Sequence, residues 1–288
     1  MLKIQKILLP VDFPNASLRV IHQAAKLAHH FHSEILMLHV VTPQSQAAGV
    51  PGGGPELARW DLLGEIIRGA EKDSDKALKP ELEDLTIQRM LVKGRAAQAI
   101  VQTAQAEGAD LIMMPSHGQT FSQFLLGTVT GKVLDGTRCP VWTDAHTEDS
   151  QVQELSIRNV LCAFDFNSHS HTTVWWAMQM AAEFGAHLTL AHVTGGVEIW
   201  GPGGNYVDPR WKKELVEDAS EHISALQKEM GTKADVLIGS GDVPKVLSQA
   251  VTQTKADLLV SGSLPYGGQL RTHGYAIICA VPIPVLSV

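Results

Sequence analysis

KILLPVDF at residues 6–13 has a second copy in the chain, NVLCAFDF at residues 159–166. Both copies are apolar runs that lead into an aspartate, Asp12 in the first and Asp165 in the second. A buried β-strand with a polar residue at its end has this pattern. Because the chain has 288 residues, a repeat at this separation predicts two similar domains in tandem.

The correspondence between the copies continues along most of the chain. With small deletions in the second copy, His39 pairs with His192, Ala109–Leu111 with Ala256–Leu258, and Pro140 with Pro284. We therefore predict a first domain over residues 1–144, a polar, acidic linker over 145–156 and a second domain over 157–288.

Composition is typical of a soluble globular protein. Hydrophobic residues make up 44% of the chain, the mean hydropathy is +0.02 and the formal net charge is −7. The negative charge argues against a surface for nucleic acid or for an anionic membrane. Three widely spaced cysteines favour neither a zinc site nor a disulfide framework. Since the sequence has no evident signal peptide or membrane span, we expect a cytoplasmic protein.

Strand-like and helix-like segments alternate in each copy. Near-continuous apolar strands joined by helical crossovers predict an α/β fold with a doubly wound parallel sheet in each domain. In the first copy we expect strands at 6–11, 35–41, 86–92, 111–114 and 141–143, and helices at 18–31, 56–79, 96–107 and 128–135.

Ligands of such a sheet bind beyond the carboxyl ends of its strands. Asp12 is positioned there to accept hydrogen bonds from ribose hydroxyls or base amines, or else to cap the next helix. Gly127 and Thr128 open a helix after the fourth strand, which makes either an anion site or an ordinary turn with a threonine cap. Neither a Walker sequence nor a GxGxxG sequence follows a strand, which disfavours P-loop NTPases and ordinary dinucleotide folds.

A set of short segments resembles the universal stress protein family. They are ILLPVDF at 7–13, LHV at 38–40, SHG at 116–118, LLGTVTGKVL at 125–134 and CPV at 139–141. The resemblance covers both copies and implies two five-stranded domains, related by a pseudo-twofold axis and paired through their last strands. It also implies a site for ATP, accompanied by Mg²⁺, although some members of the family bind none.

The resemblance assigns roles to residues of the first copy. The adenosine end of the ligand would contact Pro10, Asp12 and Val40. The phosphates would be held by residues that begin and end the loop after the fourth strand: Ser116, His117, Gly118, Gly127, Thr128, Val129 and Thr130.

Two departures from the family's pattern set the copies apart. The pattern has two glycines with two residues between them, then nine residues, then Gly-Ser or Gly-Thr. Here Pro115 replaces the first glycine and eight residues follow Gly118, so one backbone N–H is lost and the spacing is shorter. In the second copy Arg271 and Thr272 replace the Gly-Thr step. Arg271 either fills that site or, with Asp165, forms a second anion site.

These observations favour a stress-response module that binds ATP or a related nucleotide mainly in its first domain. We expect no catalytic residue and no metal ligand from the protein, and at most slow ATP hydrolysis. The alternative is a nucleotide-free interaction or chaperone-like scaffold that has lost its sites. Whether two chains form a homodimer is left open.

Overall fold

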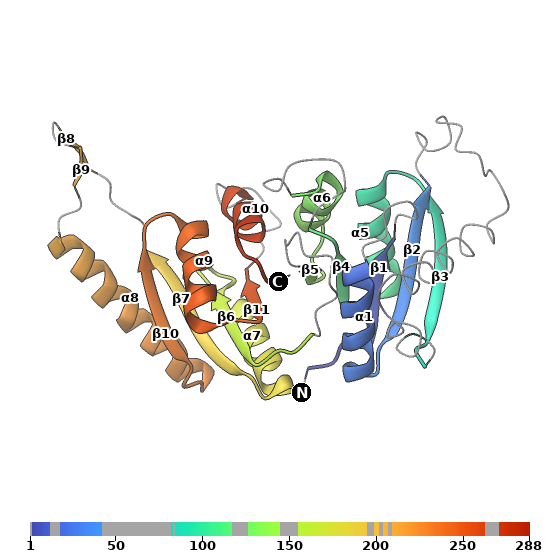
Figure 1. The fold of residues 1–288 in the computed structure, drawn as a ribbon, viewed down its shortest axis with the longest axis horizontal. Helices are drawn as coiled ribbons and strands as arrows, with labels where there is room; N and C mark the ends of the chain where they lie inside the picture. Colours follow the sequence, from blue (N-terminus) through green and yellow to red (C-terminus); the bar gives the residue numbers. More distant parts are fainter. Residues whose placement is uncertain are drawn as a thin grey trace, which may run out of the picture. The chain divides into compact units, whose positions relative to one another are not determined.

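The structure is a computed structural model that describes residues 2–11, 18–41, 82, 84–116, 126–144, 155–194, 199–201, 204–206, 209–262 and 271–288. Contacts between residues divide the chain into two compact units. The N-terminal half comprises residues 3–155, and the C-terminal half comprises residues 156–288 together with the first two residues. Figure 1 colours the N-terminal half from blue to green and the C-terminal half from yellow-green to red.

The N-terminal half is a parallel sheet of five strands with the order β3-β2-β1-β4-β5. Helix α1 contacts β1, β2 and β4, whereas α5 contacts β2 and α6. Right-handed crossovers that run in opposite directions along a sheet place their helices on opposite faces, so the sheet is doubly wound. The elements are β1 (Lys6–Pro10), α1 (Leu18–Phe31), β2 (Glu34–Val41), β3 (Ile87–Lys93), α5 (Ala96–Glu107), β4 (Leu111–Met114), α6 (Thr128–Gly136) and β5 (Val141–Thr143).

The C-terminal half repeats this arrangement, with the parallel order β10-β7-β6-β11-β12. A short antiparallel hairpin, β8 with β9, precedes α8 and was not predicted from the sequence. The elements are β6 (Asn159–Ala163), α7 (Ser170–Phe184), β7 (His187–Thr194), β8 (Ile199–Gly201), β9 (Gly204–Tyr206), α8 (Pro209–Met230), β10 (Asp235–Ser240), α9 (Val243–Thr254), β11 (Leu258–Ser261), α10 (Arg271–Ala280) and β12 (Val285–Ser287).

The predicted fold class, two doubly wound five-stranded parallel sheets in tandem, is confirmed. The described strands and helices of the N-terminal half begin and end within one residue of their predicted bounds. The helix predicted at 56–79 lies outside the described residues. Within the described segments, no helix combines the length and apolar character needed to cross a membrane.

The central strand of each half begins beside an aspartate side chain that accepts hydrogen bonds from two consecutive backbone N–H groups. In the N-terminal half, Asp110 Oδ2 accepts hydrogen bonds from the backbone N–H groups of Gln5 at 2.7 Å and Lys6 at 2.9 Å. In the C-terminal half, Asp257 Oδ2 accepts from the two residues that open β6 in the same way, at 2.8 and 2.9 Å. The aspartate before the fourth strand therefore fixes where the first strand begins.

Replacing Asp110 or Asp257 by Ala removes the one oxygen that accepts both hydrogen bonds, so two backbone N–H groups must bond to water instead. We expect the free energy of unfolding of the affected half to fall by about 1–3 kcal/mol. Native-state hydrogen exchange of β1 and β6 amides measures each half separately. Asp84→Ala, at an exposed position, is the control, and equal exchange in all three variants contradicts this role for the aspartates.

The environment of Cys139 disfavours its thiolate form. Its Sγ donates a hydrogen bond to the carbonyl of Ala109 at 3.2 Å. Burial, and secondarily the negative charge of Asp110, raises the pKa of Cys139 from 9.0 to about 12. The sequence indicated a small buried hydrophobic residue at this position, and the contacts agree with that interpretation.

At pH 8 the native protein should therefore react with iodoacetamide at Cys139 about a thousandfold more slowly than an unperturbed thiol. Below the raised pKa the thiolate fraction rises about tenfold per pH unit, so labelling should keep increasing with pH until it levels off near pH 12. Mass spectrometry of tryptic peptides measures the rate, with urea-unfolded protein as the control. Rapid labelling of Cys139 in native protein at pH 8 would contradict this prediction.

Candidate functional site

The strand order places a candidate site in each half. Along the N-terminal sheet the chain moves from β1 to β2 and β3 on one side, and to β4 and β5 on the other. The order therefore reverses between β1 and β4, and the carboxyl ends of these strands flank a crevice of the kind that holds ligands in open α/β sheets. The corresponding position in the C-terminal half lies between β6 and β11.

The segment between Ser116 and Gly127 starts and ends at almost the same point. The backbone N–H of Gly127 donates to the carbonyl of Ser116 at 2.9 Å. Thr130, which is 3% exposed, donates its Oγ1 hydrogen to the carbonyl of Pro115 at 2.9 Å. These two contacts fix the first turn of α6 against the carboxyl end of β4.

The N-terminus of α6 has the features of an anion site. Gly127 is its N-cap and supplies no side-chain hydrogen bond, and the first turn carries no acidic residue. Thr128 is exposed, and Val129 is 38% exposed. The first-turn N–H groups have no partner within the helix, and the helix dipole makes them attractive to a negative group.

The carboxyl ends of β1 and β2 are joined by a buried histidine. His39 Nδ1 lies 2.9 Å from the carbonyl of Val11, so it is the protonated nitrogen because a carbonyl only accepts. Val11 also donates its N–H to the carbonyl of Leu38 at 2.8 Å. Pro10 and Val40 are half-buried at these adjacent strand ends. Asp12, His117 and Gly118 lie outside the described residues.

The same histidine contact occurs in the C-terminal half. His192 Nδ1 lies 2.9 Å from the carbonyl of Phe164. The sequence comparison used the histidine pair only to set the register of the repeat, so this structural role was missed. A histidine at the same position near the end of the second strand in both copies was the available signal.

Asp144 is a second residue that the sequence did not single out. It is 8% exposed and follows β5. Its Oδ1 accepts hydrogen bonds from the backbone N–H of Ser116 at 2.7 Å and from Ser116 Oγ at 3.1 Å. The N–H of Gly127 and the hydroxyl hydrogens of Ser116 and Thr130 are all donated within the protein. Among the described residues, the candidate donors to an anion are therefore the backbone N–H groups of the first turn of α6 and the Thr128 hydroxyl.

The C-terminal half presents different side chains at its crevice. Asp165 is exposed, and its Oδ1 accepts from the N–H of Asn167 at 3.3 Å. Phe166, with φ of 59°, packs against His192 and His222 at ring-centroid distances of 4.4 and 5.5 Å. Arg271 and Thr272 are the first residues of α10. Where the structure describes the chain, no three His, Cys, Asp or Glu residues form a metal-binding group.

Comparisons with known proteins agree with the repeat and with the fold. The model of the universal stress protein family matches residues 3–143 and 156–286. Universal stress protein MJ0531 of Methanocaldococcus jannaschii is 31% identical over 140 residues, which are 48% of this chain and 79% of the relative.

Two solved structures are similar over nearly the full length. A functionally unknown protein from Pseudomonas aeruginosa PAO1 has a TM-score of 0.68 at 15% identity, covering 99% of this chain and 92% of that one. A universal stress protein from Archaeoglobus fulgidus has a TM-score of 0.63 at 19% identity, covering 99% and 96%. At these identities the structural likeness concerns the fold alone.

The side chains of Thr128 and Thr130 in α6 should contribute differently to the stability of the protein. Thr130→Val keeps the side-chain shape but leaves the Pro115 carbonyl without its donor, so the free energy of unfolding should fall by about 1–2 kcal/mol. Thr128→Val, at an exposed position two residues earlier, should leave stability within about 0.5 kcal/mol. Hydrogen exchange of α6 amides measures both, and a larger loss for Thr128→Val would contradict the assignment.

Proposed function

We propose a nucleotide-binding function for this chain, which belongs to the universal stress protein family. The ligand is ATP or a related nucleotide, and the site is the crevice of the N-terminal half. The observation that carries the proposal is the uncapped N-terminus of α6, held by the Gly127–Ser116 hydrogen bond where the strand order reverses. This arrangement offers several backbone donors to one anion without a rearrangement of the chain.

In this proposal the phosphates bind the backbone N–H groups at the start of α6 and the Thr128 hydroxyl, with His117 and Gly118 beside them. The adenosine group lies toward Pro10, Asp12 and Val40. A bound Mg²⁺ would be coordinated mainly by phosphate oxygens and water, as this ion usually is when no protein cage is present. The protein's contribution is positioning, and we expect at most slow hydrolysis.

The C-terminal half has a different role in the proposal. Arg271 stands where the N-terminal half has Gly127, and a guanidinium at that position either fills the phosphate site or pairs with a smaller anion near Asp165. Nucleotide binding would act by stabilising one conformation of the chain, in proportion to its differential affinity for that conformation.

The proposal extends to assembly and location. We take the domain bounds 1–144 and 157–288, pairing of the domains through their last strands, and association of two chains as parts of it. The three free cysteines suit the reducing environment of the cytoplasm.

One observation favours the alternative of a nucleotide-free scaffold. Ser116 and Thr130, two of the hydroxyl groups assigned to the phosphates, donate to Asp144 and Pro115 instead. A thermal shift of the full chain with AMP, ADP and ATP separates the two functions, since a ligand that binds only the native state must raise its stability. No shift with any nucleotide would favour the scaffold.

Gly127→Arg introduces the residue of the C-terminal half into the N-terminal site. Gly127 has φ of −56°, which any residue adopts, so the backbone can accept the change. The side chain should occupy the phosphate position, and we expect ATP affinity to fall at least tenfold by isothermal titration calorimetry. Gln105→Arg, exposed on α5, adds the same charge away from the site and is the control. Unchanged ATP affinity in Gly127→Arg would contradict the proposed site.

A further inference from the structure

Asp144 brings a carboxylate to the loop that the proposed phosphate site uses. Its Oδ1 accepts both the N–H and the hydroxyl hydrogen of Ser116, at 2.7 and 3.1 Å. The carbonyl of the same serine accepts the N–H of Gly127 at 2.9 Å. The path from Asp144 Oδ1 to the nitrogen of Gly127 consists of these two hydrogen bonds and the backbone of Ser116 between them. The two atoms are therefore at most about 9 Å apart.

The fold does not require a carboxylate at this position. In the C-terminal half the equivalent residue is Val288, whose N–H donates to the carbonyl of Ser261 at 3.0 Å. The N–H of Asp144 makes the matching bond to the carbonyl of Met114 at 3.3 Å. The fifth strand ends in the same way with an aliphatic side chain, so closing the sheet does not need the side-chain carboxylate of Asp144.

The Asp144 carboxylate accepts hydrogen bonds that the negative group of a ligand could otherwise accept. An N–H and an O–H that converge at the carboxyl end of a strand would otherwise be available to a phosphate. Asp144 takes both donors and adds a negative charge, and with 8% exposure it is shielded from water far more than a surface carboxylate. At this distance the charge acts on any phosphate bound at the N-terminus of α6.

We infer that Asp144 is a specificity-determining residue that limits the phosphate charge of the nucleotide accepted by the N-terminal half. The inference rests on the proposed nucleotide function. Each added phosphate charge is repelled by the Asp144 carboxylate, whereas the adenosine contacts are the same for all adenine nucleotides. The native site consequently discriminates against ATP relative to AMP.

The test is isothermal titration calorimetry of the full chain with AMP, ADP and ATP, without Mg²⁺. Asp144→Asn keeps an oxygen acceptor for Ser116 and removes the charge. Screened repulsion at this separation corresponds to roughly threefold in affinity per phosphate charge, so the ATP-to-AMP affinity ratio should rise about tenfold. Asp144→Val, which introduces the residue of the C-terminal half, should raise the ratio as well, and keeps the test valid if one variant does not fold.

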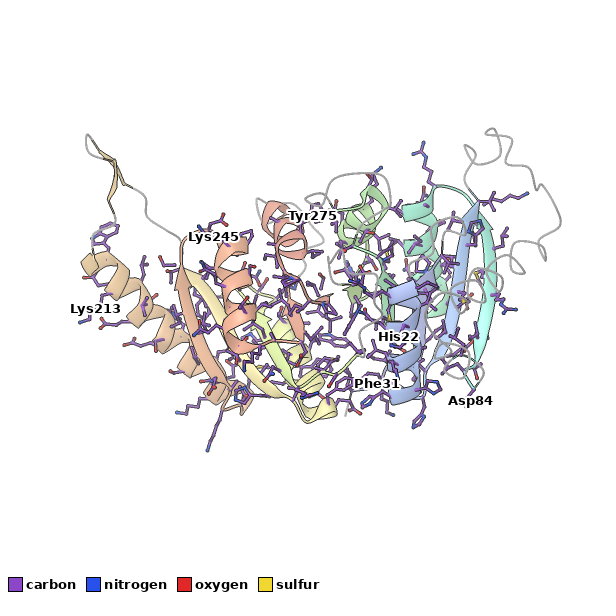
Figure 2. All side chains as sticks on the ribbon, in the orientation of Figure 1. His22, Phe31, Asp84, Lys213, Lys245 and Tyr275 are labelled. Atoms are coloured by element: carbon purple, nitrogen blue, oxygen red, sulfur yellow. The ribbon has the colours of Figure 1, made fainter. Side chains whose placement is uncertain are left out.

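Asp84→Asn is the matched control. Asp84 is exposed and precedes β3, at the amino end of the sheet, and Figure 2 labels it near the start of that strand. It removes the same charge far from the crevice and should leave the ratio unchanged. If Asp144→Asn alters the affinities for AMP, ADP and ATP by the same factor, Asp144 is only structural and the inference is overturned.

The outcomes also separate this inference from the proposed function. If the native chain binds no nucleotide but Asp144→Asn binds ATP, the inference holds and the proposed function of the native chain fails. If the native chain binds nucleotides with a ratio that Asp144→Asn does not change, the function holds and the inference fails. If neither chain binds any nucleotide, both are overturned.

Discussion

The central strand of each half has no face in contact with water, and the rest of the half follows from that constraint. In β1, Ile7 and Leu8 are fully buried and Leu9 is 1% exposed. A strand buried on both faces needs helices on both faces, and right-handed crossovers supply them only if the chain reverses direction along the sheet. The reversal leaves the crevice between β1 and β4 as the place where loops, strand ends and a helix N-terminus meet. The same burial at β6 and β11 produces the second crevice.

The two halves keep the backbone geometry of this plan while their side chains differ. After α5 the chain turns through Gly108, with φ of 64°, and the equivalent Lys255 takes φ of 51° without being glycine. After α1 the assignment is reversed, with His32 at 56° and Gly185 at 61°. Left-handed residues end helices in this way whichever residue is present, at some cost when it is not glycine. The repeat therefore preserves conformation more strictly than it preserves residue type.

The sequence predicted the strands because continuous apolar runs such as residues 6–11 have few alternative structures. It predicted a candidate site beyond the carboxyl ends of the strands because the alternation of strands and helices indicated an open, doubly wound sheet. It did not predict the contact between Asp144 and Ser116, since the two residues are 28 positions apart and neither belongs to a periodic pattern. The β8–β9 hairpin was missed for a related reason: its strands have three residues each, too few for an alternating pattern to be recognised.

The two halves differ in the charged residues that their sequences bring to the start of the helix after the fourth strand. In the N-terminal half a buried carboxylate, Asp144, lies beside the loop that leads to an uncapped helix N-terminus. In the C-terminal half Arg271 is the first residue of α10, where the helix dipole disfavours a cation by about 0.3–1 kcal/mol unless a negative group offsets it. The backbone donors at both helix starts arise from the same fold, so the two halves differ at these positions in residue type rather than in backbone plan.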